Sequence, residues 1–307
     1  MKIRHKIYTS SISWLKNSYN ISKNKGIIDC FYEPENINEL IELIKILYNK
    51  GEYFDLIGHT SNIYFMPDYS SRIMISTRSC NKFRIEKNEI ICDCGVSVRS
   101  LARQMVSLGF EGFYGLVDLP GTVAASVYGN ASCYGCSIND LLNSFDMLCT
   151  DGQIRTLRKD ALSLTKRSSS LKRGEIQGVI ISVHLNIKKG SNEDEIKKSQ
   201  IVQEKRNTTQ PGPASNLGSI YKNTGKPRFL YYILIIVVRL VSLFCKVEKK
   251  TFFFKLLGAE DIMPYVYSWN RYIWKDNNAH LKFWKFHKLH KRLFTNSEFE
   301  IEIKGKY

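Results

Sequence analysis

The stretch that decides the fold is Leu119-Pro120-Gly121-Thr122-Val123-Ala124-Ala125-Ser126-Val127-Tyr128-Gly129-Asn130-Ala131. Its Pro120-Gly121 pair fixes a tight turn, and the small residues that follow let a flat ring or a phosphate approach the main chain closely. Asn130 adds an amide that can both donate and accept hydrogen bonds. Such a long run of small residues, in an otherwise bulky sequence, indicates a ligand-binding turn rather than plain core.

A second small-residue turn, Gly58-His59-Thr60-Ser61-Asn62, follows an apolar run at 53–57 that we expect to form a buried strand. Backbone N–H groups and hydroxyls gathered in a tight turn are the donors that a diphosphate requires. An ordinary turn would show similar residues, so this segment gains its meaning only beside the others.

A third segment, Leu217-Gly218-Ser219-Ile220-Tyr221-Lys222-Asn223, places a serine behind a glycine that lets the backbone turn. No histidine stands in an obvious partner position for Ser219, so a hydrolase nucleophile is not indicated. A serine held close to a carbanion can instead pass it a proton. Lys222 and Asn223 offer a cation and an amide for a phosphate or a sugar.

The hydrophobic periodicity predicts helices and strands that are interspersed without regular alternation. A helix is predicted at 36–50, where Asn36 can cap the start, Glu39 stands three residues on, and Gly51 ends it. The other expected elements are alternating strands at 71–77 and 83–91, a helix near 97–108, a hairpin turning at Asp151-Gly152, a strand at 177–187, an exposed helix within 188–210 and a basic helix near 279–294. This order favours an α+β fold, with domains expected at 1–70, 71–195 and 196–307.

The apolar run from Phe229 to Cys245 is open to three interpretations. It has seventeen residues and contains Arg239, whereas a membrane-spanning helix needs about 20 apolar residues with few charges. Flanking basic residues are typical of a helix that lies on an anionic membrane surface; they are Lys226, Arg228, Lys246, Lys249 and Lys250. We expect a buried helix of the last domain, with membrane-surface contact and a true span as the alternatives.

The formal net charge of +16 favours polyanionic partners, namely nucleic acid, anionic lipid or phosphate-bearing small molecules, although compositional drift would give the same charge. The basic residues are spread along the chain and no nucleic-acid-binding module is recognisable, so we expect no nucleic-acid partner. The eight cysteines follow no secretory leader, which favours a reduced, cytoplasmic chain. The Cys133-x-x-Cys136 pair lacks a second pair at matching spacing, so we expect no metal.

The three small-residue segments occur in the same order and at comparable spacing in the UDP-N-acetylenolpyruvoylglucosamine reductase family, which this chain resembles. That family carries a Gly-Gly-Gly-Ser-Asn loop, an Ile-Pro-Gly turn followed by an Asn-Ala-Gly-Ala-Tyr-Gly run, a Tyr-Arg-x-Ser motif and a Gly-Ser-x-Phe-Lys-Asn-Pro motif. The corresponding segments here are 58–62, 119–135, Lys166-Arg167-Ser168-Ser169 and 218–223, with an alternating run at 299–303 near the end. The resemblance covers residues 13–225 well and 226–307 only faintly.

The resemblance implies two small α+β subdomains that hold FAD between them, as in the vanillyl-alcohol-oxidase type of flavoprotein, and a third domain that closes over the substrate. It implies hydride transfer from NADPH to the flavin and then to the enolpyruvyl ether of a nucleotide-sugar, in peptidoglycan precursor synthesis. Arg167 would stabilise the developing enolate, Ser219 would donate the proton and Glu302 would assist it. Lys222 and Asn223 would hold the nucleotide-sugar.

The residues that the resemblance assigns to FAD are Gly58, His59, Thr60, Ser61, Asn62, Pro120, Gly121, Thr122, Val123, Asn130 and Gly135. His59 and Thr60 replace two glycines of the family loop, and both resist a positive φ, so the loop must adopt another backbone or be strained. Ser132 and Lys166 also depart from the family pattern. These departures leave two alternatives: a paralogous FAD-binding oxidoreductase of another surface-glycan pathway, or a non-catalytic flavin-binding protein that contacts a membrane through 229–245.

Overall fold

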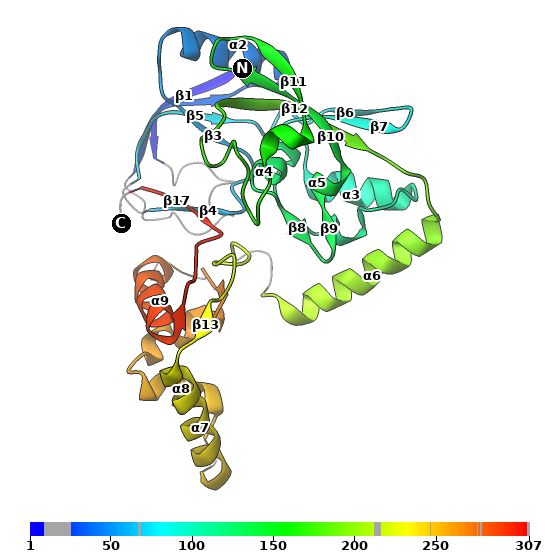
Figure 1. Ribbon diagram of the computed structural model, residues 1–307. Coiled ribbons are helices and arrows are strands. Elements are labelled where there is room, and N and C mark those ends of the chain that lie inside the picture. Colours follow the sequence, from blue (N-terminus) through cyan, green and yellow to red (C-terminus); the bar gives the residue numbers. More distant parts are fainter. Residues whose placement is uncertain are drawn as a thin grey trace. The chain divides into compact units, whose positions relative to one another are not determined.

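The computed structural model describes residues 1–8, 26–66, 69–211, 216–245, 247–274, 276 and 278–305 (Figure 1). The chain forms two compact units. The first contains residues 1–7, 27–61 and 70–210, and the second contains 8–26, 62–69 and 211–307. The domain boundaries expected at 70/71 and 195/196 stay predictions.

One sheet of the first unit is built around parallel strands. Its order is β1 (Lys2–Tyr8), β2 (Ile27–Glu33), β5 (Ser71–Ser76) and β3 (Asp55–Ile57), and β5 runs parallel to both β2 and β3. Helix α2 (Ile37–Asn49) begins at Asn36, whose side chain accepts the Glu39 N–H, as the sequence predicts. Its buried face, Leu40, Leu43, Ile44 and Leu47, packs in one core cluster with β5.

The second sheet of this unit is antiparallel, in the order β11 (Ile154–Arg158), β10 (Leu142–Cys149), β12 (Gly178–Asn186), β7 (Glu89–Asp93) and β6 (Phe83–Glu86). The predicted hairpin is confirmed, because β10 pairs with β11 around Gly152 at φ 79°. The strand predicted at 177–187 is also confirmed as β12.

Short helices cover this second sheet and bring the turns of interest to one place. They are α3 (Val98–Ser107), η2 (Tyr114–Leu116), α4 (Val123–Tyr128) and α5 (Ile138–Leu141). Their buried faces form one core cluster with Phe145, Ile180 and Val183 of the sheet. The short strands β8 (Ser132–Cys133) and β9 (Cys136–Ser137) make a hairpin, η3 (Lys159–Leu162) follows β11, and α6 (Asn192–Thr209) is the exposed helix predicted within 188–210.

The second unit is organised around aromatic side chains. Its elements are β4 (Ile63–Phe65) parallel to β17 (Glu302–Lys304), β13 (Lys226–Pro227) with β16 (Phe294–Thr295), β14 (Val266–Ser268) with β15 (Arg271–Tyr272), and the helices α7 (Phe229–Phe244), α8 (Lys249–Leu256), η5 (Glu260–Tyr265) and α9 (Ala279–Leu293). Tyr221, Tyr272, Phe283 and Phe286 are fully buried in this unit. Helix α9 therefore has a buried apolar face as well as the predicted basic one.

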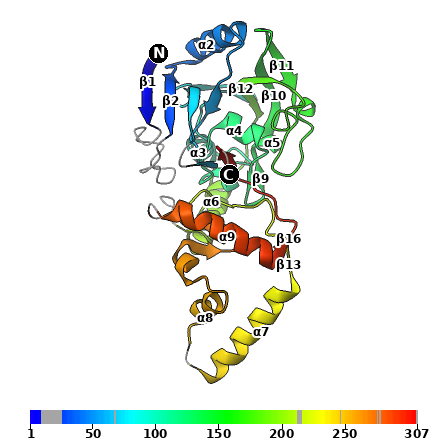
Figure 2. The ribbon, with the colours of Figure 1, turned by 90° about the vertical axis from the view of Figure 1, so that its left-hand side faces the viewer.

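The prediction that 229–245 forms a core helix is wrong. The run does form a helix, α7, but of its sixteen residues, all of them described, only Val238 is buried. Figure 2 shows α7 and α8 at one end of the second unit, where the two helices contact each other. An apolar run on all sides of a helix predicts burial, yet the described residues provide neighbours for one side of α7 only.

Three smaller expectations need correction. The strand at 71–76 is almost wholly buried rather than alternating, since β5 lies between two parallel neighbours in the sheet. The stretch 83–91 is a hairpin of β6 and β7 and not one strand, because Lys87 takes φ 51° between them. The helix predicted near 97–108 ends at Ser107, so Leu108 lies just beyond α3 and is 39 % exposed.

Candidate functional site

The two small-residue turns of the first unit pack directly against each other. A Cβ added at Gly58 would lie 2.9 Å from Thr122 Oγ1 and 3.0 Å from Thr122 Cγ2. Gly121 has φ +119°, and a Cβ there would meet Ser61 Oγ at 3.4 Å. The absence of side chains at these two glycines therefore lets the turns meet, and leaves main chain at their surface.

Both turns are anchored to the protein behind them. Thr122 is 1 % exposed, caps α4 through the Ala125 N–H, and forms a β-bridge with Ser97. Thr60 is buried at φ +54°. A β-branched residue in the left-handed region is strained, so of the two outcomes expected for the substituted loop, the structure shows strain at Thr60. His59 has no positive φ.

Positive charge surrounds the first turn. Burial, followed by the charges of Arg78 and Arg99, lowers the pKa of His59 to about 4. Burial also lowers the pKa of Arg78. The Nε of Arg99 is buried and has no hydrogen-bond partner in the part of the chain that the structure describes, and one of its terminal nitrogens lies 3.4 Å from the Asp118 carbonyl.

These groups suit a diphosphate, because its charge would be met by two guanidinium groups, hydroxyls and main-chain amides. The sequence analysis missed Arg78 and Arg99. The available signal was positional: Arg78 lies two residues after the end of strand β5, and Arg99 lies in the first turn of α3.

Asn130, near the end of the 119–131 stretch, uses its side-chain amide in hydrogen bonds within the protein. It has φ 46°, its Nδ2 donates to the Thr165 carbonyl at 2.7 Å, and its Oδ1 accepts from Asn139 Nδ2 at 3.0 Å. Its side chain therefore joins the turn after α4 to the loop that carries Arg167. Gly135 follows at φ +81° in the β8–β9 hairpin, where Tyr134 also has φ 47°.

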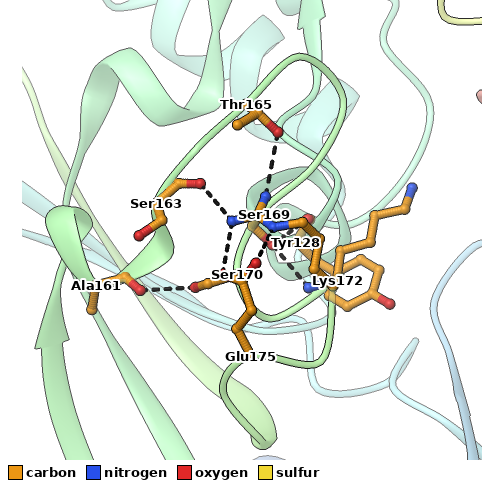
Figure 3. Close-up of polar contacts among 9 residues, drawn as sticks. Tyr128, Ala161, Ser163, Thr165, Ser169, Ser170, Lys172 and Glu175 are labelled. Carbon is orange, nitrogen blue, oxygen red and sulfur yellow. Dashed lines mark hydrogen bonds and ion pairs between the residues drawn. The ribbon is translucent and has the colours of Figure 1, made fainter.

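The loop that carries Arg167 is fastened at several points (Figure 3). Ser169 is fully buried, and its Oγ donates to the Tyr128 carbonyl at the end of α4 at 2.7 Å. Ser170 Oγ donates to the Ala161 carbonyl at 2.8 Å. The Thr165 and Ser168 main chains bond each other at 3.0 and 3.1 Å, which places Lys166 and Arg167 at the tip of a tight turn.

Arg167 is held in an unfavourable backbone conformation at that tip. It has φ +57°, and its Nη1 donates to Ser132 Oγ at 3.0 Å and lies 3.5 Å from the Asn130 carbonyl. Residues in this region of φ and ψ cost about 1–3 kcal/mol and concentrate at functional sites. Ser132, one of the departures from the family pattern, thus helps to position the guanidinium.

In the second unit, the 218–223 segment is paired with the chain near its end. The Glu300 N–H donates to the Ile220 carbonyl at 2.8 Å, the Lys222 N–H donates to the Glu298 carbonyl at 2.9 Å, and Tyr221 bridges to Phe299. Gly218 turns at φ +78° just before Ser219, which is half-buried. The 218–223 segment therefore lies beside residues 298–300, which lead into the strand that begins at Glu302.

Three predicted residues of this unit already have partners within it. Lys222 Nζ forms an ion pair with Glu298 at 3.2 Å, and Asn223 Oδ1 accepts the Gly225 N–H at 3.2 Å. Asn62 Nδ2 donates to the Glu300 carbonyl at 3.0 Å, while the Asn62 carbonyl accepts the Glu302 N–H at 2.8 Å. The last residue of the first turn is thus tied to the strand of Glu302. Arg167 belongs to the first unit, and Ser219 and Glu302 belong to the second.

Metal ligation has no support in the part of the chain that the structure describes, where no cluster of three His, Cys, Asp or Glu side chains is found. Cys133 and Cys136 face each other across the β8–β9 hairpin. Cys136 Sγ accepts the Gly115 N–H at 3.3 Å, so this cysteine has a structural partner.

Comparison with known proteins finds similarity in the part of the chain that contains the two small-residue turns. The family model of the FAD binding domain matches residues 28–158. The UDP-N-acetylenolpyruvoylglucosamine reductase of Clostridium kluyveri is 27% identical over 198 residues, 64% of each chain. The enzyme of that name from Caldicellulosiruptor saccharolyticus is 30% identical over 191 residues, 62% of this chain and 61% of the relative. The chain thus matches less than two thirds of the length of these curated relatives.

The fold extends beyond these matches. The crystal structure of UDP-N-acetylenolpyruvylglucosamine reductase from Thermus caldophilus superposes with a TM-score of 0.67 at 14% identity, covering 99% of this chain and 100% of that one. This likeness confirms the expected fold class, an α+β FAD-binding fold with a further α+β unit toward the end of the chain. The chain is thus similar to UDP-N-acetylenolpyruvoylglucosamine reductases in sequence over part of its length, and in fold over nearly all of it.

Proposed function

We propose that the protein is an FAD-dependent oxidoreductase that uses NADPH to reduce the enolpyruvyl ether of UDP-N-acetylglucosamine enolpyruvate, giving UDP-N-acetylmuramate for peptidoglycan synthesis. The observation that carries the proposal is the pair of apposed turns at Gly58 and Gly121, with Arg78, Arg99 and His59 beside them. The names of the curated relatives support the reaction.

FAD would be held by its diphosphate along the apposed turns. The main chain at 58–61 and 120–123, the Ser61 and Thr122 hydroxyls and the two guanidinium groups are the donors there. When bound, FAD supplies the hydride carrier between NADPH and the substrate. The buried Nε of Arg99 has no hydrogen-bond partner among the described residues, which fits this role, since an anion would satisfy that donor.

Arg167 would meet the carboxylate of the enolpyruvyl group and stabilise the negative charge that develops on it. Its strained backbone and its bond to Ser132 Oγ fix the guanidinium before substrate arrives, so little reorganisation is needed at reaction. Ser219 would deliver the proton to carbon, and Glu302, on the adjoining strand, would assist that transfer.

The nucleotide-sugar would contact Lys222 and Asn223. Lys222 is paired with Glu298, whose side chain is 70% exposed. A substrate phosphate would replace this carboxylate as the partner of the ammonium group. Exchanging this partner would cost little, because exposed ion pairs contribute only about 0–1 kcal/mol.

A second candidate is an oxidoreductase of another surface-glycan pathway, with FAD in the same place. The observation that favours it is Ser132, which stands where the family motif has a glycine and whose hydroxyl accepts a hydrogen bond from the Arg167 guanidinium. A different acid group in the substrate would then compete with Ser132 for the arginine. In either case we place the protein in the cytoplasm, where the cysteines, all of them free, stay reduced.

The test begins with the absorption spectrum of the purified protein and identification of the released cofactor. Turnover is then followed as NADPH oxidation with UDP-N-acetylglucosamine enolpyruvate. We expect Arg167→Ala to abolish turnover and keep FAD, and Lys166→Ala, at the exposed neighbour, to keep both. A folded protein that refuses FAD refutes the proposal. Bound FAD without turnover on this substrate would favour the second candidate, and equal activity of the Arg167 variant would exclude its assigned role.

A further inference from the structure

Helix α7 exposes a continuous apolar face. The exposed fractions are 79% for Phe229, 57% for Ile236, 52% for Leu240, 76% for Leu243 and 88% for Phe244. These positions recur every three or four residues and so lie on one side of the helix, together with Tyr232 and Ile233. The face leaves on the order of 800 Å² of apolar surface in water, more than the roughly 300–600 Å² of the largest patch on a typical monomer.

The opposite side of α7 is fixed to the protein. Val238 is buried there, and Tyr231 makes edge contacts with Phe253 of α8 and with Trp269. Because α7 is anchored along this side, its exposed face is held outward on a rigid element. None of the described helices is long and apolar enough to cross a membrane.

Positive charge accompanies the apolar face. Residues 226–258 contain seven Lys or Arg and one Glu. Lys226 and Arg228 precede α7, Arg239 lies within it, and Lys249 and Lys250 begin α8, all with exposed side chains. An apolar helix face bordered by cations is the composition of helices that lie in the plane of an anionic membrane surface.

A cavity beside α7 has the same chemistry. Its volume is about 490 Å³, and its apolar walls include Ile235, Phe253 and Trp269. Arg239, Lys249 and Lys250 also line it. Lys250 Nζ donates a hydrogen bond to the Val266 carbonyl at 2.9 Å, whereas the structure gives Arg239 and Lys249 no ion pair with a described carboxylate.

We propose that α7 docks the protein on a bilayer surface that carries anionic phospholipids, with its exposed face among the acyl chains and the flanking cations at the phosphates. A second copy of the chain fits less well, because two such faces would bring the same cations together without acidic partners. Nucleic acid would be attracted by the charge but gives the apolar face nothing to bury. This inference is independent of the flavin and of the proposed reaction.

The test is co-sedimentation of the full-length protein with vesicles of phosphatidylcholine containing 30% phosphatidylglycerol, and with vesicles of phosphatidylcholine alone. We expect binding to the anionic vesicles, at least tenfold weaker binding to the neutral ones, and weakening by salt. Ile236→Glu with Leu243→Glu should lower binding at least tenfold. The matched control is Ile201→Glu on α6, where the side chain is 65% exposed in the other unit, and its binding should not change.

Retained FAD content and an unchanged melting temperature show that the variants are folded, which separates this test from that of the proposed function. No binding to anionic vesicles overturns the inference, as does equal binding by the double variant. Light scattering provides the remaining arm. If the wild-type protein is a dimer that does not bind vesicles, and the double variant is a monomer, the apolar face binds a second copy of the chain. That result would overturn the proposal that α7 docks on a membrane.

Discussion

The contact between Gly58 and Thr122 is the point at which the proposed FAD site can be perturbed with least ambiguity. In Gly58→Ala the new Cβ would stand 2.9 Å from Thr122 Oγ1 and 3.0 Å from Cγ2, whereas ordinary contact begins near 3.4 Å. Thr122 cannot easily yield, because it is 1 % exposed and its Oγ1 caps α4. The turns must therefore separate by several tenths of an ångström, and overpacking of this kind costs about 1–3 kcal/mol.

A double-mutant cycle isolates this clash. Thr122→Ala removes Oγ1 and Cγ2 and should cost about 1 kcal/mol through loss of the cap. In the double variant the nearest remaining Thr122 atom of the original set is Cβ, which lies 3.5 Å from the new methyl group and is unstrained. We expect the double variant to be about as stable as Thr122→Ala, which gives a favourable coupling of about 1–3 kcal/mol.

The assays are urea unfolding of the FAD-free protein and the FAD dissociation constant from flavin fluorescence. Gly58→Ala should weaken FAD at least tenfold, since the main-chain donors of the two turns move apart. Gly129→Ala is the control, because Gly129 has φ −87° and an added Cβ would lie 3.3 Å from its nearest neighbour, the Ala125 carbonyl oxygen, which is slightly closer than ordinary contact and much milder than the clash at Gly58. If the effects of Gly58→Ala and Thr122→Ala add within about 0.5 kcal/mol, the apposition of the turns is not what the structure indicates.

Three further predictions follow from single contacts. Ser169→Ala loses the hydrogen bond to the Tyr128 carbonyl and should lower kcat about tenfold or more while FAD is retained. Ser170→Ala loses a hydrogen bond of similar length to the Ala161 carbonyl, so it should lower the free energy of unfolding by about the same 1–2 kcal/mol but lower kcat less. Equal kcat values for the two variants would contradict the role given to Ser169. Burial lowers the pKa of His287 and His290 to about 4, so below pH 6.5 the unfolded chain binds protons that the folded chain does not. The free energy of unfolding should therefore fall on the order of 2 kcal/mol per histidine between pH 6.5 and pH 4. Thermal unfolding followed by the fluorescence of Trp269, Trp274 and Trp284 measures this loss, and a melting temperature that stays constant between pH 7 and 4.5 would contradict it. Cys245 is exposed, whereas burial raises the pKa of Cys92 to about 12, so a thiol reagent should modify Cys245 first in the native protein. Mass spectrometry of the labelled peptides measures the order, and modification of Cys92 before Cys245 would show that the second sheet opens to solvent.

The sequence predicts the regular elements of the first unit well, because their local signals agree with their packing. Asn36 caps α2 and Gly152 turns the hairpin, and in both cases one residue decides the geometry. The strand β5 was predicted in place but not in its burial, since nothing local to 71–76 indicates that both neighbouring strands are parallel. What surrounds an element depends on residues distant in sequence.

The same limit applies to the candidate site and to α7. The small-residue turns were visible, but Arg78 and Arg99 gain meaning only when the folded chain brings both beside His59. The apolar run at 229–244 looked like core because composition does not report what covers it. Its neighbours, α8 and the segment with Trp269, cover one side and leave the other exposed.

The positions of backbone strain bear on whether the altered loops still serve a cofactor. Thr60, Asn130, Tyr134 and Arg167 all take a positive φ without being glycines, and each lies in a segment that the family resemblance assigns to FAD or substrate. At Thr60 the family motif has glycine, so the substitution has retained a glycine-like backbone at a cost of about 1 kcal/mol or more. Had the loop no need to keep its shape, a β-branched residue would relax to a negative φ. The main-chain path, rather than the residue, is therefore what the fold preserves, and a diphosphate would recognise that path.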